Sequence, residues 1–309
     1  MTISFSILIT THNRKSELLF TLHRLKATIN RKDVEYIVCD DGSSDGTFEA
    51  IQSTFPEIIL VHNKHSIGLI GSRNKLLSMA RGNYAISLDD DAHFLSQNPL
   101  EIIEKTFSEN PQCGVIAFRI YWGIDAPKET IHNASLKQVR GFVGCGHAWN
   151  MNAWKTIPNY PEWFIFYGEE DFAAHHLFLH NLTILYVPDI LIHHRVDVSL
   201  RKQQKDYRLR LRRSLRSGWY LMILFYPWWS IPRRFAYSFW TQLKKRTLSG
   251  DMLGTIAIFQ AIGDLIFKLP KLIALSQRYT EKQFHTYSLL TPTKIYWSPI
   301  ENTNIQHDY

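Results

Sequence analysis

The sequence predicts an α/β fold in which a mainly parallel sheet carries helices on both faces and is followed by a helical extension. Strand-like and helix-like segments alternate through the first 120 residues, as in right-handed βαβ units. Polar or acidic clusters follow three of those strands. The net charge then changes from −5 over residues 1–200 to +12 over residues 201–309. We therefore expect one α/β domain over 1–200 and a basic, aromatic-rich helical extension over 201–309.

The predicted strands are short, apolar and rich in β-branched residues. They lie at 4–10, 35–39, 58–61, 84–88, 114–120 and 183–187. Apolar residues at helical spacing and favourable helix ends predict helices at 15–29, 47–55, 72–80, 99–109 and 169–180. The helix at 169–180 begins with three carboxylates, which suit the positive end of a helix dipole. The glycine-rich segment 141–147 is expected to be flexible and to cross near a ligand.

Composition excludes several classes of protein. With 45% apolar and 20% charged residues, the chain is not disordered. Its three cysteines are too few and too scattered for a disulfide framework or a cysteine-based zinc site. The segment after Met1 has no basic region and no cleavage site, so we expect no signal peptide. These features together favour a cytoplasmic location.

The three polar clusters predict a ligand site. Thr10–Asn13, Asp40–Asp41 and Asp89–Asp91 each follow a predicted strand, and parallel sheets bind ligands beyond the carboxyl ends of their strands. Carboxylates as close as those of Asp89–Asp91 repel one another unless a cation lies between them, and oxygen ligands of this kind suit Mg²⁺ or Mn²⁺. A solvated turn or a helix cap is the alternative for each acidic cluster.

Six short motifs, taken in order, make the chain similar to a known family. They are Ile9–Arg14, Asp40–Asp45, Gly68 with Ser72–Asn74, Ala80–Tyr84, Leu88–Asp91 and Glu169–Asp171. In this order and spacing they resemble the family 2 glycosyltransferases over about residues 3–200. The resemblance implies the GT-A fold, a Rossmann-like nucleotide-sugar-binding architecture. It also implies transfer of a sugar, with inversion, from a nucleotide-diphosphate sugar to a hydroxyl acceptor.

The resemblance also implies roles for individual residues. Those expected to bind the nucleotide sugar are Thr10, His12, Asp41, Arg73, Asp89 and Asp90. Asp89 and Asp91 correspond to the D-x-D pair that holds Mg²⁺ or Mn²⁺, with Asp91 in direct contact. Asp171 corresponds to the catalytic base, and its neighbour Glu170 is the alternative because Ala173 stands where the family often has another aspartate.

A histidine pair supplies a further metal-ligand candidate. His193 and His194 follow a strand-like segment, and an imidazole is an acceptable ligand for Mn²⁺. We expect His193 before His194 in this role. The alternative is a loop histidine that hydrogen-bonds to the scaffold.

The extension contains two apolar segments, 218–229 and 252–269, among many basic residues. Proline interrupts the first, and polar residues interrupt the second, so both suit helices lying in a membrane interface better than spanning ones. The expected anchors at headgroup depth are Trp219, Trp228, Trp229 and Trp240. We expect peripheral attachment to the cytoplasmic face of a membrane. An ordinary helical subdomain or an oligomer interface is the alternative.

The expected partners are a nucleotide-diphosphate sugar and a lipid-linked or polysaccharide glycan acceptor. A dehydrogenase is a poor alternative because no G-x-G-x-x-G motif follows the first strand. A nucleotidyltransferase-like enzyme and a nucleic-acid-binding protein that uses the basic extension remain alternatives. The apolar segments around the tryptophans argue against nucleic acid, whose binding grooves are more polar.

Overall fold

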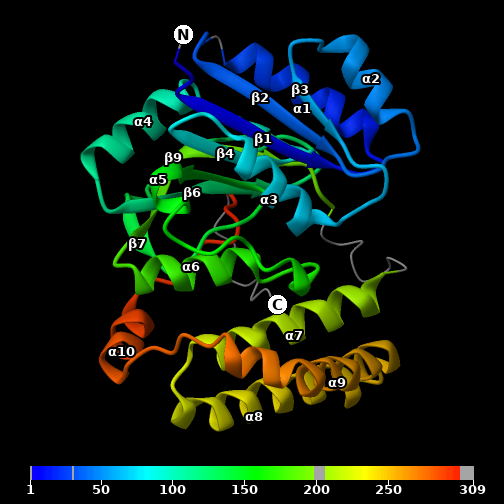
Figure 1. The fold of residues 1–309 in the computed structure, drawn as a ribbon, viewed down its shortest axis with the longest axis vertical. Coiled ribbons are helices and arrows are strands. Elements are labelled where there is room, and N and C mark those ends of the chain that lie inside the picture. Colours follow the sequence, from blue (N-terminus) through cyan, green and yellow to red (C-terminus); the bar gives the residue numbers. More distant parts are fainter. Residues whose placement is uncertain (1, 30, 198–205, 300–309) are drawn as a thin grey trace.

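A computed structural model describes residues 2–29, 31–197 and 206–299 of the chain. Its centre is a nine-stranded mixed sheet (Figure 1). The strands are β1 (Phe5–Thr11), β2 (Val34–Asp40), β3 (Ile59–His62), β4 (Tyr84–Asp89), β5 (Ala92–Phe94), β6 (Cys113–Trp122), β7 (Lys137–Val139), β8 (Gly146–Asn150) and β9 (Thr183–His194). Their order is β3-β2-β1-β4-β8-β6-β9-β5, and β7 pairs with β9.

Five long strands of this sheet end at one edge. β1 is parallel to β2 and β4, and β6 is parallel to β9. Because β8 is antiparallel to both β4 and β6, those two strands run in the same direction. The mainly parallel sheet is therefore confirmed, and the antiparallel strands β5, β7 and β8 are additions to it. The carboxyl ends of β1, β2, β4, β6 and β9 consequently face the same side.

Helices cover both faces of the sheet, as predicted. They are α1 (Lys15–Thr28), α2 (Thr47–Thr54), α3 (Leu69–Met79), α4 (Pro99–Glu109), α5 (Met151–Trp154) and α6 (Glu169–Leu179). Buried leucines of α1 and apolar residues of α4 form one core with the sheet. α3, α5 and α6 share a second core on the other face. In α4 the apolar spacing supplies the buried face, whereas α3 and α6 also bury polar and charged side chains.

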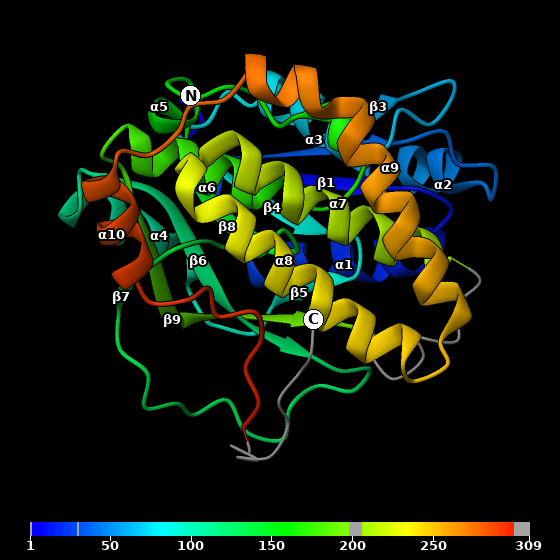
Figure 2. The same cartoon turned by 90° about the horizontal axis from the view of Figure 1, so that it is seen from below.

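The extension forms the helices α7 (Tyr207–Phe225), α8 (Ile231–Gln242), α9 (Met252–Ala274) and α10 (Glu281–Leu289). They lie below the face of the sheet that carries α6 (Figures 1 and 2). Leu224 and Phe225 of α7 and Phe284 and Tyr287 of α10 belong to the same buried core as α3 and α6. The extension is therefore packed on the α/β body. The predicted boundary at residue 200 falls outside the described residues and stays a prediction.

Two observations bear on the apolar segments of the extension. Trp219 is only 1% exposed, packs against Phe235 and donates a hydrogen bond to Ser238. It is therefore a core residue, and its expected role as a membrane anchor was wrong. Among the described residues, α9 is the one helix whose length and composition would allow it to cross a membrane, and 22% of its apolar stretch is buried.

Candidate active site

The strand-end clusters meet at the common edge of the sheet. Parallel pairing sets Thr10 beside Asp89 and Thr11 beside Asp40. The Thr11 hydroxyl donates a hydrogen bond to Asp90 Oδ2 at 2.8 Å. The three clusters therefore form one polar surface, as expected for the ligand-binding edge of an α/β sheet.

Asp89, Asp91 and His194 form a cluster that could hold a metal ion. One ligand atom from each lies within 4.8 Å of the other two. His194 Nε2 lies 3.0 Å from Asp91 Oδ1 and 3.9 Å from Asp89 Oδ2. Two carboxylates and one imidazole are donors that suit Mn²⁺ and, with more water in the coordination shell, Mg²⁺. The chemistry of this donor set fits the predicted cation.

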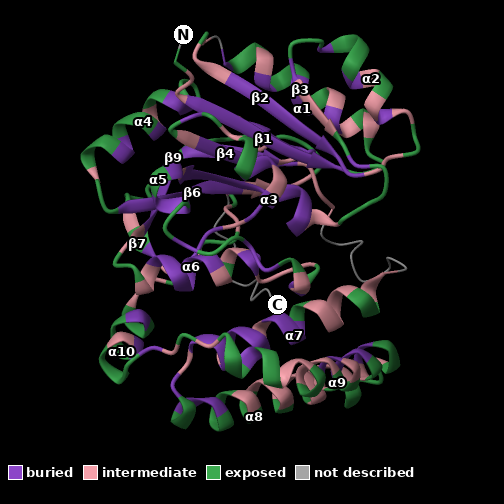
Figure 3. Cartoon of the chain, viewed as in Figure 1, coloured by how far each residue is buried: buried purple, intermediate pink, exposed green. Residues whose placement is uncertain are grey.

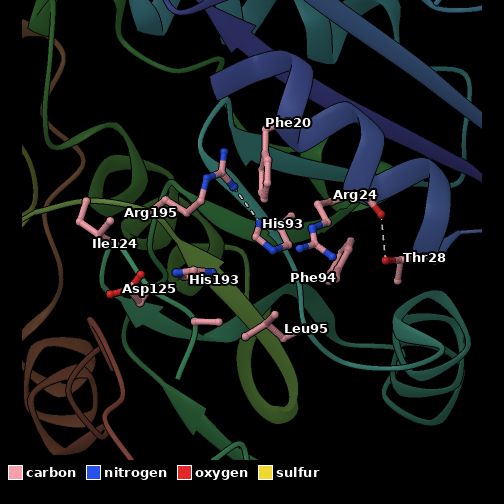
Figure 4. Close-up of a pocket in the computed structure, with 11 residues that line it drawn as sticks. Phe20, Arg24, Thr28, His93, Phe94, Leu95, Ile124, Asp125, His193 and Arg195 are labelled. Carbon is pink, nitrogen blue, oxygen red and sulfur yellow. Dashed lines mark hydrogen bonds between the residues drawn. The ribbon is translucent and has the colours of Figure 1, made fainter. Parts of the chain in front are cut away.

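The metal cluster uses His194 and not His193. The two histidines are neighbours on β9 and point to opposite faces, because side chains alternate along a strand. His193 Nε2 contacts the Gly123 carbonyl oxygen at 2.8 Å. Its ring lines a separate cavity of about 510 Å³ together with Arg24 and Arg195 (Figure 4). The preference for His193 is corrected accordingly.

Charges around the cluster set its protonation in the absence of a cation. Burial opposes ionisation of Asp91, but His194 and the Arg14 guanidinium, whose Nη2 lies 2.6 Å from Asp91 Oδ2, hold its pKa below the ordinary value. Burial disfavours the His194 cation too, yet its interactions with Cys145 and Asp91 raise the pKa of His194 to about 11. A metal ion would take the place of this proton.

Asp90 is turned into the protein. It is 6% exposed, and its carboxylate lies between Thr11 and Arg14 Nε, which is 3.2 Å away. Burial raises the pKa of Asp90 to about 7. Its contacts suit it to join β4 to β1 and α1, and its expected contact with a nucleotide sugar stays a prediction.

Arg73 connects the metal cluster to the start of α6. Its Nη2 lies 2.9 Å from Asp89 Oδ1, and its Nη1 lies 2.9 Å from Glu169 Oε1 and 3.1 Å from Glu170 Oε1. Nη2 also donates to the Gly144 carbonyl oxygen at 3.1 Å. The side chain is 5% exposed. Arg73 therefore binds the acidic side chains of Asp89, Glu169 and Glu170 from the protein interior. In this position it can orient the two that reach the site surface, Asp89 and Glu170.

The two candidate bases differ in their surroundings. Glu170 accepts a hydrogen bond from Arg73. Asp171 is exposed to solvent at the start of α6, and its Oδ1 faces Gly141 on one side. Partial desolvation of its carboxylate, together with the neighbouring Glu170, raises the pKa of Asp171 to about 6. A carboxylate with that pKa is ionised at neutral pH and is more basic than an ordinary aspartate.

The end of β2 organises the loop that precedes α3. Asp41 accepts hydrogen bonds from Asn63 Nδ2, Ser66 Oγ and the backbone N–H groups of Ile67 and Gly68, at 2.6–2.9 Å. Burial works against its charge, but these donors lower the pKa of Asp41. His12 is exposed and bonds through Nδ1 to the Asp41 carbonyl oxygen at 2.9 Å. This places the His12 ring beside the Asp41 backbone, and the expected role of both residues in a nucleoside pocket stays a prediction.

The motifs gave no role to three residues that the structure brings into the site. Glu169 is 2% exposed, and burial with repulsion from Glu170 raises its pKa to about 8. Gly144 lies so close to Arg73 and Glu170 that a Cβ there would collide with both. Arg14 closes the metal cluster on its outer side. Arg14 and Glu169 lie inside the recognised motifs, and Gly144 lies in the segment expected to cross near a ligand. Their positions in these segments could therefore have indicated that they belong to the site.

The family model for glycosyl transferase family 2 matches residues 6–180. The chain therefore belongs to this family. A β-1,3-glucosyltransferase of Escherichia coli, WfaP, named for UDP-Glc and α-D-GlcNAc-diphosphoundecaprenol, is 33% identical over 29% of this chain and 36% of its own length. The glycosyltransferase YfnE of Bacillus subtilis is 32% identical over 44% of this chain and 36% of its own length. The chain thus spans about a third of the curated relatives it matches.

Solved structures support the GT-A fold. The mannosyltransferase PcManGT of Pyrobaculum calidifontis, in complex with GDP-Man and Mn²⁺, has a TM-score of 0.56 at 15% identity, covering 93% of this chain and 79% of that one. TarS 1–349 of S. aureus, in complex with UDP-GlcNAc, has a TM-score of 0.58 at 15% identity, covering 89% and 84%. At such identity the likeness concerns the fold. Together with the family match it confirms the predicted architecture, and it favours glycosyl transfer over the nucleotidyltransferase and nucleic-acid alternatives.

Proposed function

We propose that this chain transfers a sugar from a nucleotide-diphosphate sugar to an acceptor hydroxyl, with inversion at the anomeric carbon. The observation that supports the proposal is the connection between two groups of side chains through Arg73. On one side stand the candidate metal ligands Asp89, Asp91 and His194. On the other stand Glu170 and Asp171 at the start of α6. A diphosphate held on the first side would present its sugar toward the second.

Asp171 is the proposed base. Asp171 is exposed to solvent, whereas the Glu170 carboxylate is held by Arg73 at 3.1 Å. Its raised pKa suits general-base catalysis near neutral pH. The ionised carboxylate takes the acceptor's hydroxyl proton while the acceptor oxygen attacks the anomeric carbon. The bond from that carbon to the diphosphate oxygen breaks in the same displacement, which inverts the configuration.

The remaining residues hold the donor. Asp89, Asp91 and His194 would hold Mg²⁺ or Mn²⁺, which supplies charge stabilisation to a leaving diphosphate. Thr10, His12 and Asp41 lie at the nucleoside end of the polar edge. Arg73 keeps Asp89 and Glu170 in fixed positions from inside the protein. This division of roles follows the order of the groups along the sheet edge.

The direct test is a donor-hydrolysis panel of UDP-, GDP- and dTDP-sugars with Mn²⁺ or Mg²⁺. We expect metal-dependent release of one nucleoside diphosphate. Asp171→Asn is expected to leave nucleotide affinity within a few fold while turnover falls by about 10²-fold or more. If Glu170→Gln has this effect and Asp171→Asn does not, the base is Glu170. Full activity in EDTA would refute the metal assignment.

A lipid-linked glycan is the proposed acceptor. WfaP is named for a diphosphoundecaprenol-linked substrate, and the surface of the extension suits a lipid bilayer. Large apolar side chains are exposed in the turn before α8, along α8, in the turn after it and in the first part of α9. They are Trp228, Trp229, Tyr237, Trp240, Leu248, Met252, Leu253, Ile256 and Phe259. Figure 3 shows these helices as less buried than the body, on the side of α7 away from the sheet.

Basic residues accompany this apolar surface. Arg233, Arg234 and Lys244 are exposed on α8 and the turn after it. Each basic residue near an anionic leaflet contributes about 1 kcal/mol, and Trp and Tyr suit headgroup depth. On α9, Ala257 and Ile258 are buried, and Asp264 pairs with Arg212 at 2.5 Å. These features support peripheral attachment, with α8 and α9 lying in the interface. Three free, buried cysteines accord with the reducing cytoplasmic side.

Co-sedimentation of the full chain with vesicles tests the attachment. Binding is expected to rise with the anionic lipid fraction and to fall with salt. Phe259→Glu with Phe267→Glu should weaken it, because both rings are exposed, at 58% and 80%. Ile131→Glu is the matched control, since Ile131 is 80% exposed on the α/β body. Failure of the full chain to bind anionic vesicles at low salt would refute the attachment and favour an interface between protein chains.

A further inference from the structure

The last described segment of the chain, residues 290–299, returns from α10 to the active site. We call it the C-terminal strap. The Arg140 backbone N–H donates to the Thr291 carbonyl oxygen at 2.9 Å. The Trp297 backbone N–H donates to the Ile120 carbonyl oxygen at 2.5 Å, beside a parallel bridge between Tyr121 and Trp297. The strap is therefore fixed to the sheet at two points.

The second of these points lies at the end of β6. β8 pairs with β6 only over Val115–Ala117, so the end of β6 offers its edge to the strap. The Arg119 guanidinium lies over the Trp297 ring, 4.3 Å from its centroid. Such a contact adds a cation–π attraction to the backbone pairing. Trp297 thus anchors the strap and determines where its neighbour Tyr296 lies.

Tyr296 reaches the metal cluster through one intermediate ring. Its ring stacks on Trp122, with centroids 5.8 Å apart and planes at 28°. Trp122 in turn meets His194 edge-on, with centroids 5.8 Å apart and planes at 82°. Aromatic pairs in these geometries are attractive beyond the area they bury. A chain of three rings therefore runs from the strap to His194.

Packing matters here because hydrogen bonding does little to orient this imidazole. Histidine ligands are commonly oriented by a hydrogen bond from their second ring nitrogen. His194 Nδ1 is buried and has no such partner within the described residues. The Cys145 thiol interacts with the imidazole, but a thiol is only a weak hydrogen-bonding group. The direction in which Nε2 points is then determined by what touches the faces and edges of the ring.

We propose that Tyr296 is a positioning residue for the metal site, acting through Trp122 to hold His194 with Nε2 toward Asp89 and Asp91. The inference deepens the proposed function and rests on its metal site. It assigns a role to a residue far outside the family-matching region, 6–180. Because the ring contacts of Tyr296 lead through Trp122 to the candidate metal ligand His194, its effect is expected on metal affinity.

The test measures binding of Mn²⁺ alone by electron paramagnetic resonance, and then in the presence of UDP. Tyr296→Leu removes the ring and keeps apolar bulk, so Mn²⁺ affinity is expected to fall roughly tenfold, the lower end of the range for outer contacts to metal ligands. Tyr296→Phe keeps the stack and should stay within about twofold of wild type. Ile131→Ala is the control, since Ile131 is 80% exposed on the α/β body and belongs to neither the metal site nor the proposed membrane surface.

A second pair of variants separates positioning from general loss of structure. In a Trp122→Leu background, Tyr296→Leu is expected to have no further effect on Mn²⁺ affinity, because the connection is already broken. Unchanged Mn²⁺ affinity in folded Tyr296→Leu would overturn the inference, as would equal losses in Tyr296→Leu and Tyr296→Phe or additive losses with Trp122→Leu. If the wild-type protein binds no Mn²⁺ even with UDP, the metal part of the proposed function fails instead.

Discussion

Replacing Arg73 with methionine is expected to destabilise the protein strongly. Arg73 is 5% exposed and faces Asp89, Glu169 and Glu170 at 2.9–3.1 Å. Methionine keeps the apolar bulk of the stem but leaves Asp89, Glu170 and, above about pH 8, an ionised Glu169 without their shared cation. Removing one partner from a buried ionic group costs about 3–5 kcal/mol. We expect a loss of that size in the free energy of unfolding, measured by urea denaturation.

Arg31 provides a matched control. It also faces three carboxylates, Asp33, Glu101 and Glu104, at 2.7–3.4 Å. The two glutamates are about half exposed, so solvent screens them. Arg31→Met should therefore cost no more than about 1 kcal/mol. Comparing the losses in unfolding free energy of Arg73→Met and Arg31→Met isolates the effect of burial, because each arginine faces three acidic side chains.

The loss in Arg73→Met is also expected to depend on pH. The pKa of Glu169 in the folded protein is about 8, above its ordinary value, so the stability that depends on its neutral form is lost as pH rises. Arg73 limits that rise in pKa, and its removal raises the pKa further. The deficit relative to wild type should therefore grow above about pH 8. Glu169→Gln in the Arg73→Met background should recover stability near pH 9 and little near pH 6.

An Arg73→Met protein within about 1 kcal/mol of wild type at both pH values would refute the reasoning. It would mean that water reaches the three carboxylates when the guanidinium is removed. Recovery by Glu169→Gln to the same extent at both pH values would separately contradict the assigned titration of Glu169.

Three further predictions concern the site. Turnover should rise with pH up to about 6 and then level off, because Asp171 acts in its ionised form. A pH–rate profile that lacks this rise on the acidic side, or that is unchanged in Asp171→Asn, would contradict the prediction. His194→Ala should weaken Mn²⁺ binding at least tenfold while His193→Ala changes it little, and calorimetric titration that finds the reverse order would restore His193. Asp91→Asn should abolish metal-dependent donor hydrolysis in a protein that keeps its wild-type circular dichroism, and retained activity would remove Asp91 from the metal site.

Much of the fold could be predicted from local pattern. The strands that became β1, β2 and β4 are continuous apolar segments, and α1 and α4 have the expected buried faces. β8 was missed because Gly146–Asn150 contains no β-branched residue and begins with a glycine. It forms a strand because it fits between β4 and β6, where Trp149 is fully buried. That stabilisation comes from tertiary packing, which local propensity does not contain.

Site residues that lie in contiguous motifs could be predicted from the sequence. Those that depend on which face of a strand a side chain occupies, or on contacts between distant segments, could not. Choosing between His193 and His194 requires knowing that β9 continues through both residues past Pro188. A bulge beside Phe118 and Arg119 accommodates this proline. The position of Arg73 beneath carboxylates from β4 and α6 is a property of packing. No spacing along the chain encodes it.

The core shared between the body and the extension has a consequence for the order in which this chain folds. The apolar face under α3 and α6 is completed by Phe225, Tyr279 and Tyr287. A ribosome must therefore synthesise nearly the whole chain before that face can close, and until then the emerging sheet has one finished side and one open side. Newly made chains with an open apolar face tend to aggregate or to bind chaperones. Production of this protein should accordingly be sensitive to truncation near residue 225 or beyond, even where every active-site residue is retained.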